Sequence, residues 1–431
     1  WDSTFIDLRQ SNMIIEKSQT YEGDPSEIER YVAEARFFRA YSHFRLMAKY
    51  NDIPILTKVL TVDSPELYGS RNKQQEVEDF ILSELNEVYA KLPLQSELSS
   101  DEAGRVTQGA ALALKARVAL FAGTWAKYHQ HRSDYQQLLQ QAIDAATKVI
   151  DSGEYALYEG SGEESYRYLF INAGDNSKEG IFDSRYETDI RHHSDACPVY
   201  WGWRGTPTRK LADMYLCKST GLPIENANSG FEGYATIKSE YENRDPRMKG
   251  TLMLPGMEWN GKLFTNNLPA SSTCCIRKWY TPEDTVNEYD GSLDFYVIRY
   301  AEVLLSLAEA MIEKGGYPQA EITGYINEVR ARVGMPAVEV VEGTNLNKEE
   351  LRAIVRHERR VELAFEDLRF ADLYRWGEFE NAQKRMQKDQ SFYGFGVVSR
   401  GNLRGAQDLV WPIPQGEIDT NPMLEQHSEW K

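Results

Sequence analysis

Apolar residues recur at intervals of three or four positions through most of the first and last thirds of the chain. This spacing predicts amphipathic helices, because residues three and four apart share one face of a helix. The predicted helices cover residues 5–18, 25–50, 74–92, 108–127, 135–151, 296–314, 319–333 and 351–376. Two pairs of neighbours, over 108–151 and 296–333, repeat at about 35–40 residues, a period that matches a tetratricopeptide-like unit. The pattern therefore predicts a mainly α fold in which helical pairs stack as a solenoid.

The last predicted helix, residues 351–376, carries acidic and basic side chains on the faces away from its apolar stripe. Glu358, Glu362 and Glu366 are spaced four apart on one face, so their charges repel unless basic side chains pair with them. The expected partners lie three residues away: Arg359 for Glu362, Arg369 for Glu366 and, further along, Arg375 for Asp372. A catalytic carboxylate pair or a metal site is the alternative, but ion-pair networks commonly imitate such sites. We interpret this helix as ion-paired and locked into the solenoid.

Helical periodicity fades between residues 156 and 294, where Gly, Pro, Asn and Ser are frequent and several tryptophans occur. Long irregular segments inside an ordered domain tend to carry function. We therefore predict one domain with three parts. They are an N-terminal helical part over 1–155, a loop-rich inserted subdomain over 156–294 that is the candidate ligand-binding part, and a C-terminal helical part with an extended tail over 295–431.

The composition narrows the classes of partner. The chain has 431 residues, of which 41% are hydrophobic, so it can bury a large core. Its formal net charge of -17 disfavours nucleic acid and anionic membrane surfaces, because both require a basic protein surface. An uncharged or cationic ligand suits this charge better. No apolar run is long enough to span a bilayer.

Patterns typical of metal sites and catalysis are absent from the sequence. The four cysteines, Cys197, Cys217, Cys274 and Cys275, do not show zinc-ligand spacing. Cys197 and Cys217 could form a disulfide, whereas the adjacent pair could do so only under strain, and the pairing stays open. No acidic spacing singles out a hydrolase. We therefore predict a protein that is not an enzyme and needs no cofactor; whether loop carboxylates hold a structural calcium cannot be read from the sequence.

Aromatic and polar side chains lie next to each other at four places. A sugar ring has an apolar CH face, which flat aromatic rings cover, and a belt of hydroxyls, which Asn, Asp, Arg and Gln can hydrogen-bond. The alternative is that the rings fasten an irregular subdomain that has few aliphatic residues. We predict that at least one of the four clusters contacts ligand: Tyr68 with Arg71; Tyr200, Trp201, Trp203 and Arg204; Trp259; and Trp279 with Tyr280.

Four stretches resemble signatures of the SusD/RagB family, whose members are outer-membrane nutrient-binding lipoproteins of Bacteroidetes. They are EARFFRAYSHFRLMAKYNDIPIL (34–56), YENRDPRM (241–248), RHERRVELAFEDLRFADLYRWG (356–377) and, in the tail, WPIPQGEI followed by NP (411–422). Asn51 stands where a glycine is usual in the family, and the ending at Gln426–Trp430 is altered. The resemblance covers nearly the whole chain.

This resemblance implies an α-helical, tetratricopeptide-like protein on the extracellular face of the outer membrane, held by a lipid anchor upstream of Trp1. It implies a partner, a SusC-like TonB-dependent transporter, to which the protein passes a captured glycan without catalysis. Three other functions remain open from the residues. The protein could be a peptide-binding member of the same family, a helical adaptor that binds only proteins, or a glycoside hydrolase.

Overall fold

The computed structural model describes residues 1–193, 207, 209–254, 256–259, 262–264, 275–280, 291–382 and 405–431. These residues form many helices and a few short strands, so the predicted mainly α fold is confirmed. The chain groups into two units. Unit 1 comprises Trp1–Glu154, Phe370–Gln383 and Asn402–Lys431, and unit 2 comprises Tyr155–Arg369 and Lys384–Gly401.

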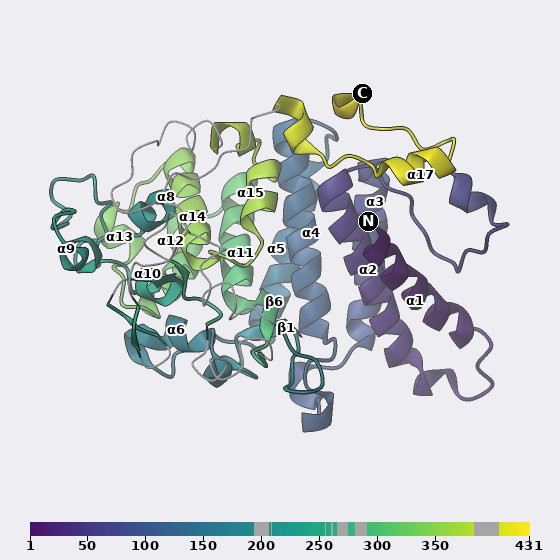
Figure 1. Ribbon diagram of the computed structural model, residues 1–431, viewed down its shortest axis with the longest axis horizontal. Helices are drawn as coiled ribbons and strands as arrows, with labels where there is room; N and C mark the ends of the chain where they lie inside the picture. Colours follow the sequence, from purple (N-terminus) through teal and green to yellow (C-terminus); the bar gives the residue numbers. More distant parts are fainter. Residues whose placement is uncertain are drawn as a thin grey trace. The chain divides into compact units, whose positions relative to one another are not determined.

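Unit 1 is built on five long helices, seen from purple to blue in Figure 1. They are α1 (Asp2–Ser18), α2 (Glu29–Tyr50), α3 (Gln74–Val88), α4 (Gln108–His129) and α5 (Tyr135–Asp151). Small residues let α4 and α5 approach closely, as the sequence predicts: a Cβ added at Gly123 would lie 3.1 Å from the Leu139 side chain. The tail adds α17 (Gln415–Thr420), and short 3-10 helices punctuate the unit at 25–27, 65–68, 89–91, 95–97, 100–102, 405–409 and 428–430.

Unit 2 combines helical pairs with short irregular elements. Its longer helices are α11 (Tyr300–Lys314), α12 (Gln319–Ala331) and α14 (Lys348–Glu362), with α13 (Val338–Val341) between the last two and α15 (Arg369–Arg375) beginning at its boundary. The middle of the chain supplies α6 (Ser165–Leu169), α8 (Arg209–Met214), α9 (Ile237–Tyr241) and α10 (Pro246–Thr251). Two 3-10 turns lie at 162–164 and 172–174.

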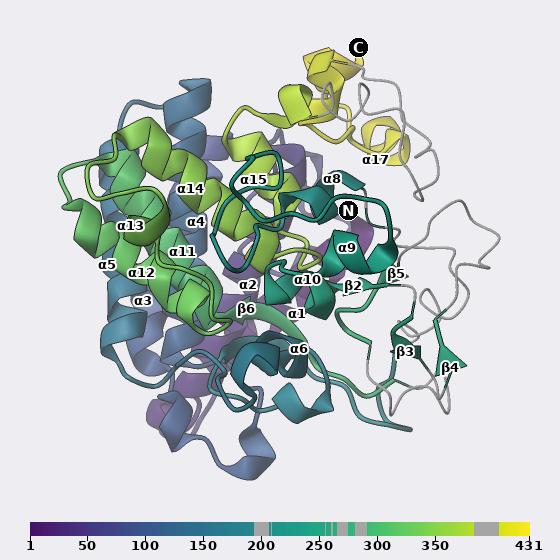
Figure 2. The same cartoon turned by 90° about the vertical axis from the view of Figure 1, so that its left-hand side faces the viewer.

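Three two-stranded antiparallel pairs complete the described part of unit 2. β1 (Gly180–Ser184) pairs with β6 (Phe295–Arg299), β2 (Leu252–Met253) with β5 (Cys275–Ile276), and β3 (Glu258–Trp259) with β4 (Lys262–Leu263). Figure 2 shows β2 and β5 near α10, and β3 with β4 as a separate pair. Cys217 is buried and its thiol is free in this structure, while Cys197 lies outside the described residues.

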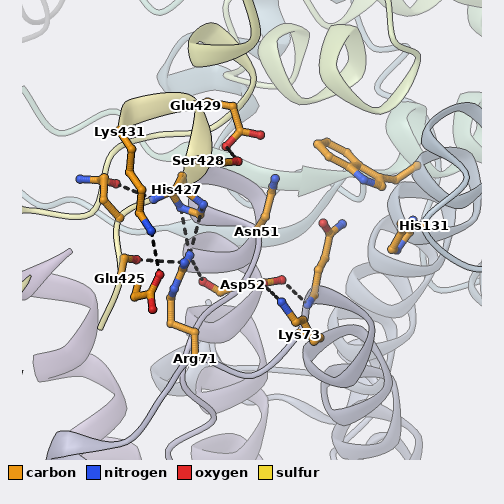
Figure 3. A pocket seen from close by; sticks show the side chains of 13 residues that line it. Asn51, Asp52, Arg71, Lys73, His131, Glu425, His427, Ser428, Glu429 and Lys431 are labelled. Carbon is orange, nitrogen blue, oxygen red and sulfur yellow. Dashed lines mark hydrogen bonds and ion pairs between the residues drawn. The ribbon is translucent and has the colours of Figure 1, made fainter. Parts of the chain in front are cut away.

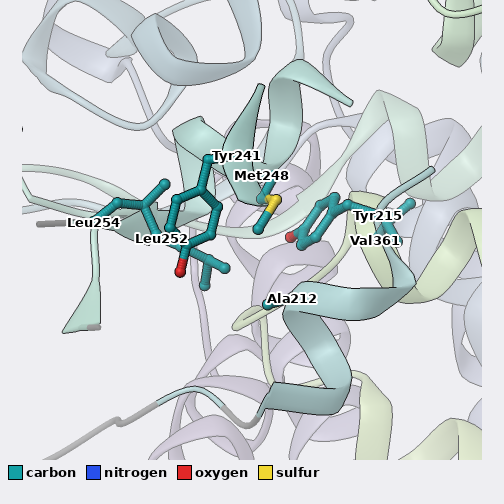
Figure 4. Close-up of a cluster of buried hydrophobic side chains, with 7 residues drawn as sticks. All are labelled: Ala212, Tyr215, Tyr241, Met248, Leu252, Leu254 and Val361. Atoms are coloured by element: carbon teal, nitrogen blue, oxygen red, sulfur yellow. The ribbon is translucent and has the colours of Figure 1, made fainter. Parts of the chain in front are cut away.

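The two units divide the chain differently from the three predicted parts. Residues 295–431 do not form one part, because 295–369 belong to unit 2 while the tail belongs to unit 1. Packing explains the difference. β6 pairs with β1 from the middle of the chain, and Val361 of α14 packs in a core cluster with Tyr215, Met248 and Leu252 (Figure 4).

The predicted single helix over 351–376 is wrong: α14 ends at Glu362 and α15 begins at Arg369. Backbone carbonyls between them accept hydrogen bonds from distant side chains rather than from the next helical turn. Lys278 Nζ donates to the Ala364 carbonyl at 2.9 Å, and Trp279 Nε1 donates to the Phe365 carbonyl at 3.0 Å. Phe365 and Asp367 adopt φ values of +60° in this connection, which an α-helix does not allow.

The interpretation of Glu358, Glu362 and Glu366 as ion-paired is confirmed, with partners from other elements. Glu362 lies 2.5 Å from Arg332, 2.7 Å from Arg299 and 3.1 Å from Arg247. Burial alone would raise the pKa of Glu358, but Arg247 and Arg330 outweigh it and hold that pKa at about 2. Five acidic and five basic side chains make up this buried network, which comprises Glu179, Asp245, Glu358, Glu362, Glu366, Arg247, Lys278, Arg299, Arg330 and Arg332.

Candidate ligand-binding site

Three aromatic side chains line one pocket of about 470 Å³ in unit 1. Trp1 and Phe5 come from the start of α1, and Tyr68 comes from the 3-10 turn Pro65–Tyr68 in the connection between α2 and α3. The Tyr68 side chain is 45% exposed, so its ring is open to a ligand. We call this cavity the ring pocket. Its other lining residues include Ile6, Leu56, Leu67, Leu424, and the polar Asp2, Arg9, Lys58, Glu66 and Thr420.

The polar side of α1 holds the α2–α3 connection in place. Asn12, which is buried, donates from Nδ2 to the carbonyls of Leu56 and Lys58, both at 3.1 Å. Arg9 donates to the Leu60 carbonyl at 2.8 Å, and the Glu16 carboxylate accepts from the Val59 N–H at 2.6 Å. These side chains satisfy backbone groups that would otherwise be unpaired next to a helix. The connection is therefore fixed along its first half.

His43 of α2 also holds the connection between α2 and α3. Its Nδ1 lies 2.7 Å from the Arg39 carbonyl, and its Nε2 lies 3.2 Å from the Leu56 N–H. The neutral ring with its proton on Nδ1 satisfies both contacts, because Nδ1 then donates and Nε2 accepts. Burial lowers the pKa of His43 to about 4, so the ring is neutral at neutral pH.

The tail forms the opposite wall of the ring pocket. Asn421 donates from Nδ2 to the carbonyls of Leu67, at 3.2 Å, and Gly69, at 3.0 Å, which are the two residues that flank Tyr68. Its Oδ1 accepts from the Met423 N–H at 2.9 Å. The tail is in turn held to α2, since the Trp411 N–H donates to the Lys49 carbonyl at 2.9 Å. One amide side chain therefore determines where the Tyr68 backbone lies.

Replacing Asn421 with alanine is expected to loosen the turn that carries Tyr68. The Leu67 and Gly69 carbonyls lose their donor, at about 0.5–1.5 kcal/mol for each hydrogen bond. Hydrogen exchange followed by mass spectrometry should show faster exchange over residues 64–70 and little change in α4. Gln415→Ala, an exposed change in the same tail, is the control. Equal exchange in the two variants would contradict the role given to Asn421.

A second cavity, of about 480 Å³, lies where the same connection and the same tail continue (Figure 3). We call it the polar pocket. Arg71 donates from Nη2 to the Glu425 carbonyl at 3.0 Å, and its Nη1 lies 3.1 Å from the His427 ring. Burial and the charge of Arg71 lower the pKa of His427 to about 4, so this ring faces the guanidinium in its neutral form. Asn51, Asp52, Lys73, His131, Glu429 and Lys431 also line the cavity.

The predicted ligand contacts are placed differently by the structure. Tyr68 lines the ring pocket and Arg71 the polar pocket, so the structure brings this pair to one connection. Tyr200, Trp201, Trp203 and Arg204 lie outside the described residues. Trp259 lies in β3, where its backbone pairs with Lys262. The ligand roles of these five residues stay predictions.

Trp279 and Tyr280 pack into unit 2. Tyr280 is 4% exposed and packs with Met253 and Phe264. Trp279 is partly buried against Phe170, with ring centroids 4.8 Å apart, and its N–H is bonded to the Phe365 carbonyl. Core packing accounts for both rings, so their ligand role stays a prediction to which their positions add no support.

The sequence does not single out Trp1, Phe5 or Asn421 as site residues. Phe5 opens a predicted helix, and Asn421 lies within a family signature. One feature of the sequence indicates a ligand role for Trp1 and Phe5 weakly: an aromatic pair at the start of an amphipathic helix can face outward. Only the folded tail, however, shows that these residues meet around Tyr68.

Within the described residues, no group of three or more His, Cys, Asp or Glu side chains is arranged to hold a metal ion. No helix in the described ranges combines the length and the apolar character needed to cross a bilayer.

Comparison with known proteins adds a family. Residues 168–430 match the model of the SusD family, and residues 1–120 match a model described as starch-binding and associating with the outer membrane. The SusD-like protein P38 of Formosa agariphila is 25% identical over 99% of this chain and 78% of its own length.

Solved structures agree. A crystal structure of a SusD-like protein from Bacteroides fragilis is 26% identical, with a TM-score of 0.80, over 99% of this chain and 85% of that one. A SusD-like carbohydrate-binding protein from the same organism is 24% identical, with a TM-score of 0.82, over the same shares of the two chains. The four signature stretches, the helical fold and a family model that matches more than half of the chain lead to one conclusion: the chain belongs to the SusD family.

Proposed function

We propose that this protein captures a glycan in the ring pocket and passes it, chemically unchanged, to a SusC-like TonB-dependent transporter in the outer membrane. The observation that carries the proposal is the ring pocket itself, which a half-exposed Tyr68 lines together with aromatic, aliphatic and polar side chains. Family membership supports it, as does a structural neighbour that is itself named as carbohydrate-binding.

The pocket has the two kinds of surface that a sugar ring needs. Trp1 and Phe5 lie with ring centroids 4.9 Å apart and planes at 53°, and with Tyr68 they present flat faces to an apolar CH surface. Arg9, Lys58 and Thr420 on the rim can donate to hydroxyls, and Asp2 and Glu66 can accept from them. A few polar groups around an apolar floor are typical of small-ligand sites.

The electrostatics of the rim favour binding over hydrolysis. A glycosidase needs one carboxylic acid whose pKa is raised, so that it can protonate the leaving oxygen. Glu66 is the rim carboxylate nearest in sequence to Tyr68, and its hydrogen bond with Lys58 lowers its pKa, the opposite of what a general acid requires. The proposal is therefore capture without cleavage.

Tyr68→Ala is expected to weaken glycan binding about tenfold or more, because truncating a central aromatic anchor typically costs over 1–2 kcal/mol. Affinity electrophoresis against starch, laminarin, xylan and pectin identifies the bound polysaccharide, and calorimetry measures the dissociation constant. The matched control is Tyr31→Ala, which removes a tyrosine of similar exposure, 48%, that does not line the pocket. Equal affinity in the two variants would remove the ring pocket from the proposal.

The same experiments separate the alternatives. A folded protein that binds none of the polysaccharides but is recovered with peptides or proteins would favour a peptide-binding member or an adaptor. Release of reducing ends from the bound glycan would favour a hydrolase. Transfer to the transporter and an upstream lipid anchor are parts of the proposal that rest on family membership. Co-purification of the full-length protein with a TonB-dependent transporter from outer membranes tests the first, and labelling with a fatty-acid probe tests the second.

A further inference from the structure

We infer that the polar pocket is a second saccharide-binding site and that Asn51 is its central recognition residue. The inference rests on the proposed glycan-binding function and extends it, because it gives the ligand two points of attachment. Three polar groups in this cavity have unused bonding capacity: Asn51, His131 and Arg71.

Asn51 is held in a strained backbone conformation that its own side chain does not explain. It ends α2 with φ of 56° and ψ of −95°, a region that favours glycine. Its N–H donates to the Met47 carbonyl at 2.9 Å, and its side-chain amide lines the polar pocket without a hydrogen bond to the other residues drawn there (Figure 3). Strained residues persist where the surrounding structure enforces them and are often functional. A half-buried amide at a strained position, open to the cavity, is available to a ligand.

His131 offers a hydrogen-bond acceptor in the same cavity. Its Nε2 lies 3.3 Å from the buried Glu78 carboxylate, which can only accept, so Nε2 carries the proton. Nδ1 is buried and has no partner in the described part of the chain. In the neutral ring this nitrogen is an acceptor without a partner, and a ligand hydroxyl reaches it once the side chains that cover it turn aside.

Arg71 supplies a cation that no carboxylate pairs with. Its hydrogen bonds go to the carbonyls of Asp52 and Glu425 and to the His427 ring, and no described acidic group lies within ion-pair distance of it. The acidic groups nearby have other partners, since Asp52 pairs with Lys73 at 3.0 Å and Glu425 with Lys431 at 2.7 Å. Arg71 can therefore donate further hydrogen bonds.

The charge balance indicates the chemical class of the ligand. Three basic residues, Arg71, Lys73 and Lys431, face three acidic ones, Asp52, Glu425 and Glu429, so the cavity has no net formal charge to attract an anion or a cation. Both donors and acceptors line it, and hydroxyl groups can bond to both. A neutral, polyhydroxylated ligand fits this arrangement, and its volume lies within the usual range for small-ligand sites.

The position of the cavity explains why a glycan would use both sites. Gly69 and Leu424 line the ring pocket, whereas Arg71 and Glu425 line the polar pocket. Arg71 is two positions after Gly69, and Glu425 directly follows Leu424, so the two pockets are neighbours along both segments. A long oligosaccharide stacked on Tyr68 can extend past the contact between Arg71 and Glu425 into the polar pocket. A short oligosaccharide can occupy only one of the two.

The test is Asn51→Gly, which removes the amide and relieves the backbone strain together. Calorimetry uses short and long oligosaccharides prepared from the polysaccharide that the wild type binds. We expect the long ligand to bind about 2–10-fold more weakly, the loss of one or two hydrogen bonds, the short ligand to be unaffected, and the melting temperature not to fall. Asn51→Asp, which keeps the size but removes the donor, should show the same loss. The control is Gln130→Gly, which relieves a similar φ of 58° outside the cavity.

The outcomes separate the two proposals. Unchanged affinity of Asn51→Gly and Asn51→Asp for long ligands overturns the second site and leaves the ring pocket untouched. Loss in these variants with full binding by Tyr68→Ala overturns the ring pocket and supports the polar pocket. A wild type that binds none of the oligosaccharides overturns both. Loss of affinity in a variant that melts no earlier than the wild type cannot be ascribed to unfolding.

Discussion

Glu362→Gln should lower the free energy of unfolding by about 3–5 kcal/mol, the usual cost of breaking a buried ion pair from one side. The change keeps the shape of the side chain and removes one negative charge from a network that has five of each sign. Arg332, Arg299 and Arg247, which contact the carboxylate, would then share a buried surplus of one positive charge. Urea denaturation of the wild-type and mutant proteins at neutral pH, where both are folded at the start, measures this change in the free energy of unfolding.

The control lies on the same helix. Glu349→Gln removes a carboxylate whose side chain is 76% exposed and which pairs with Arg352. Exposed pairs contribute about 0–1 kcal/mol, so this variant should unfold close to the wild-type midpoint. Similar losses of unfolding free energy in the two variants would mean that burial does not determine how much these charges contribute to stability. Any loss of glycan binding by Glu362→Gln at temperatures where it is folded would contradict its purely structural role.

The buried network shows how far the spacing of charges can be interpreted. The four-residue spacing of Glu358, Glu362 and Glu366 was enough to predict that they are paired, since three like charges on one face cannot be buried alone. It was not enough to name the partners. Arg375 does pair with Asp372 at 2.7 Å, as predicted. The fully buried carboxylates instead pair with arginines from other elements, because neighbours on one helix can reach a carboxylate from one side only.

The break in the helix has the same origin. An apolar stripe with the right period continues past Glu362, so local pattern alone predicts one helix. The carbonyls of Glu362, Ala364 and Phe365 instead accept from Tyr166, Lys278 and Trp279, whose positions depend on the folded middle of the chain. Donors that are distant in sequence decide the end of α14, and no window of sequence contains them.

The candidate site was only partly predictable for a related reason. Residue type made Tyr68 and Arg71 candidates, since a ring and a guanidinium three residues apart suit a sugar. What makes Tyr68 accessible is its clamp by Asn421, which is distant in sequence, and the packing of α1 against the connection. Trp279 and Tyr280 had equally suitable residue types but pack into unit 2, because composition does not reveal which rings the core needs.

Acidification is the second change with a large expected effect, and His43 should cause much of it. Its pKa falls from 6.5 to about 4 on folding, mainly through burial, so the unfolded chain takes up a proton at higher pH than the folded one. The stabilisation by neutral His43 is therefore complete above pH 6.5 and is lost as the pH falls toward 4. A shift of this size corresponds to about 3 kcal/mol. Urea midpoints measured between pH 7 and 4.5 should fall accordingly.

The variant His43→Gln separates this effect from others. It should be less stable at pH 7 but lose less stability between pH 6.5 and 4.5, since no imidazole remains to be protonated. His192→Gln, at an exposed position, is the control and should keep the wild-type slope. The window stops at pH 4.5 so that buried carboxylates do not contribute to the slope. Folding lowers the pKa of Glu358, for example, from 4.5 to about 2, so the stability that this carboxylate contributes falls only below pH 4.5. A His43→Gln protein with the wild-type slope would assign the acid sensitivity to another group.

Protonation of His43 should also weaken glycan binding in the ring pocket. A protonated His43 can no longer accept from the Leu56 N–H, and it would place two like hydrogens against each other at the start of the connection. The connection then loses its His43 anchor at Leu56 and keeps those to α1, and Tyr68 lies at its far end. Glycan affinity should therefore fall with pH in the wild type before the protein unfolds, and this decline should be absent in His43→Gln. Binding that stays constant down to the unfolding pH would show that His43 stabilises the unit without positioning Tyr68.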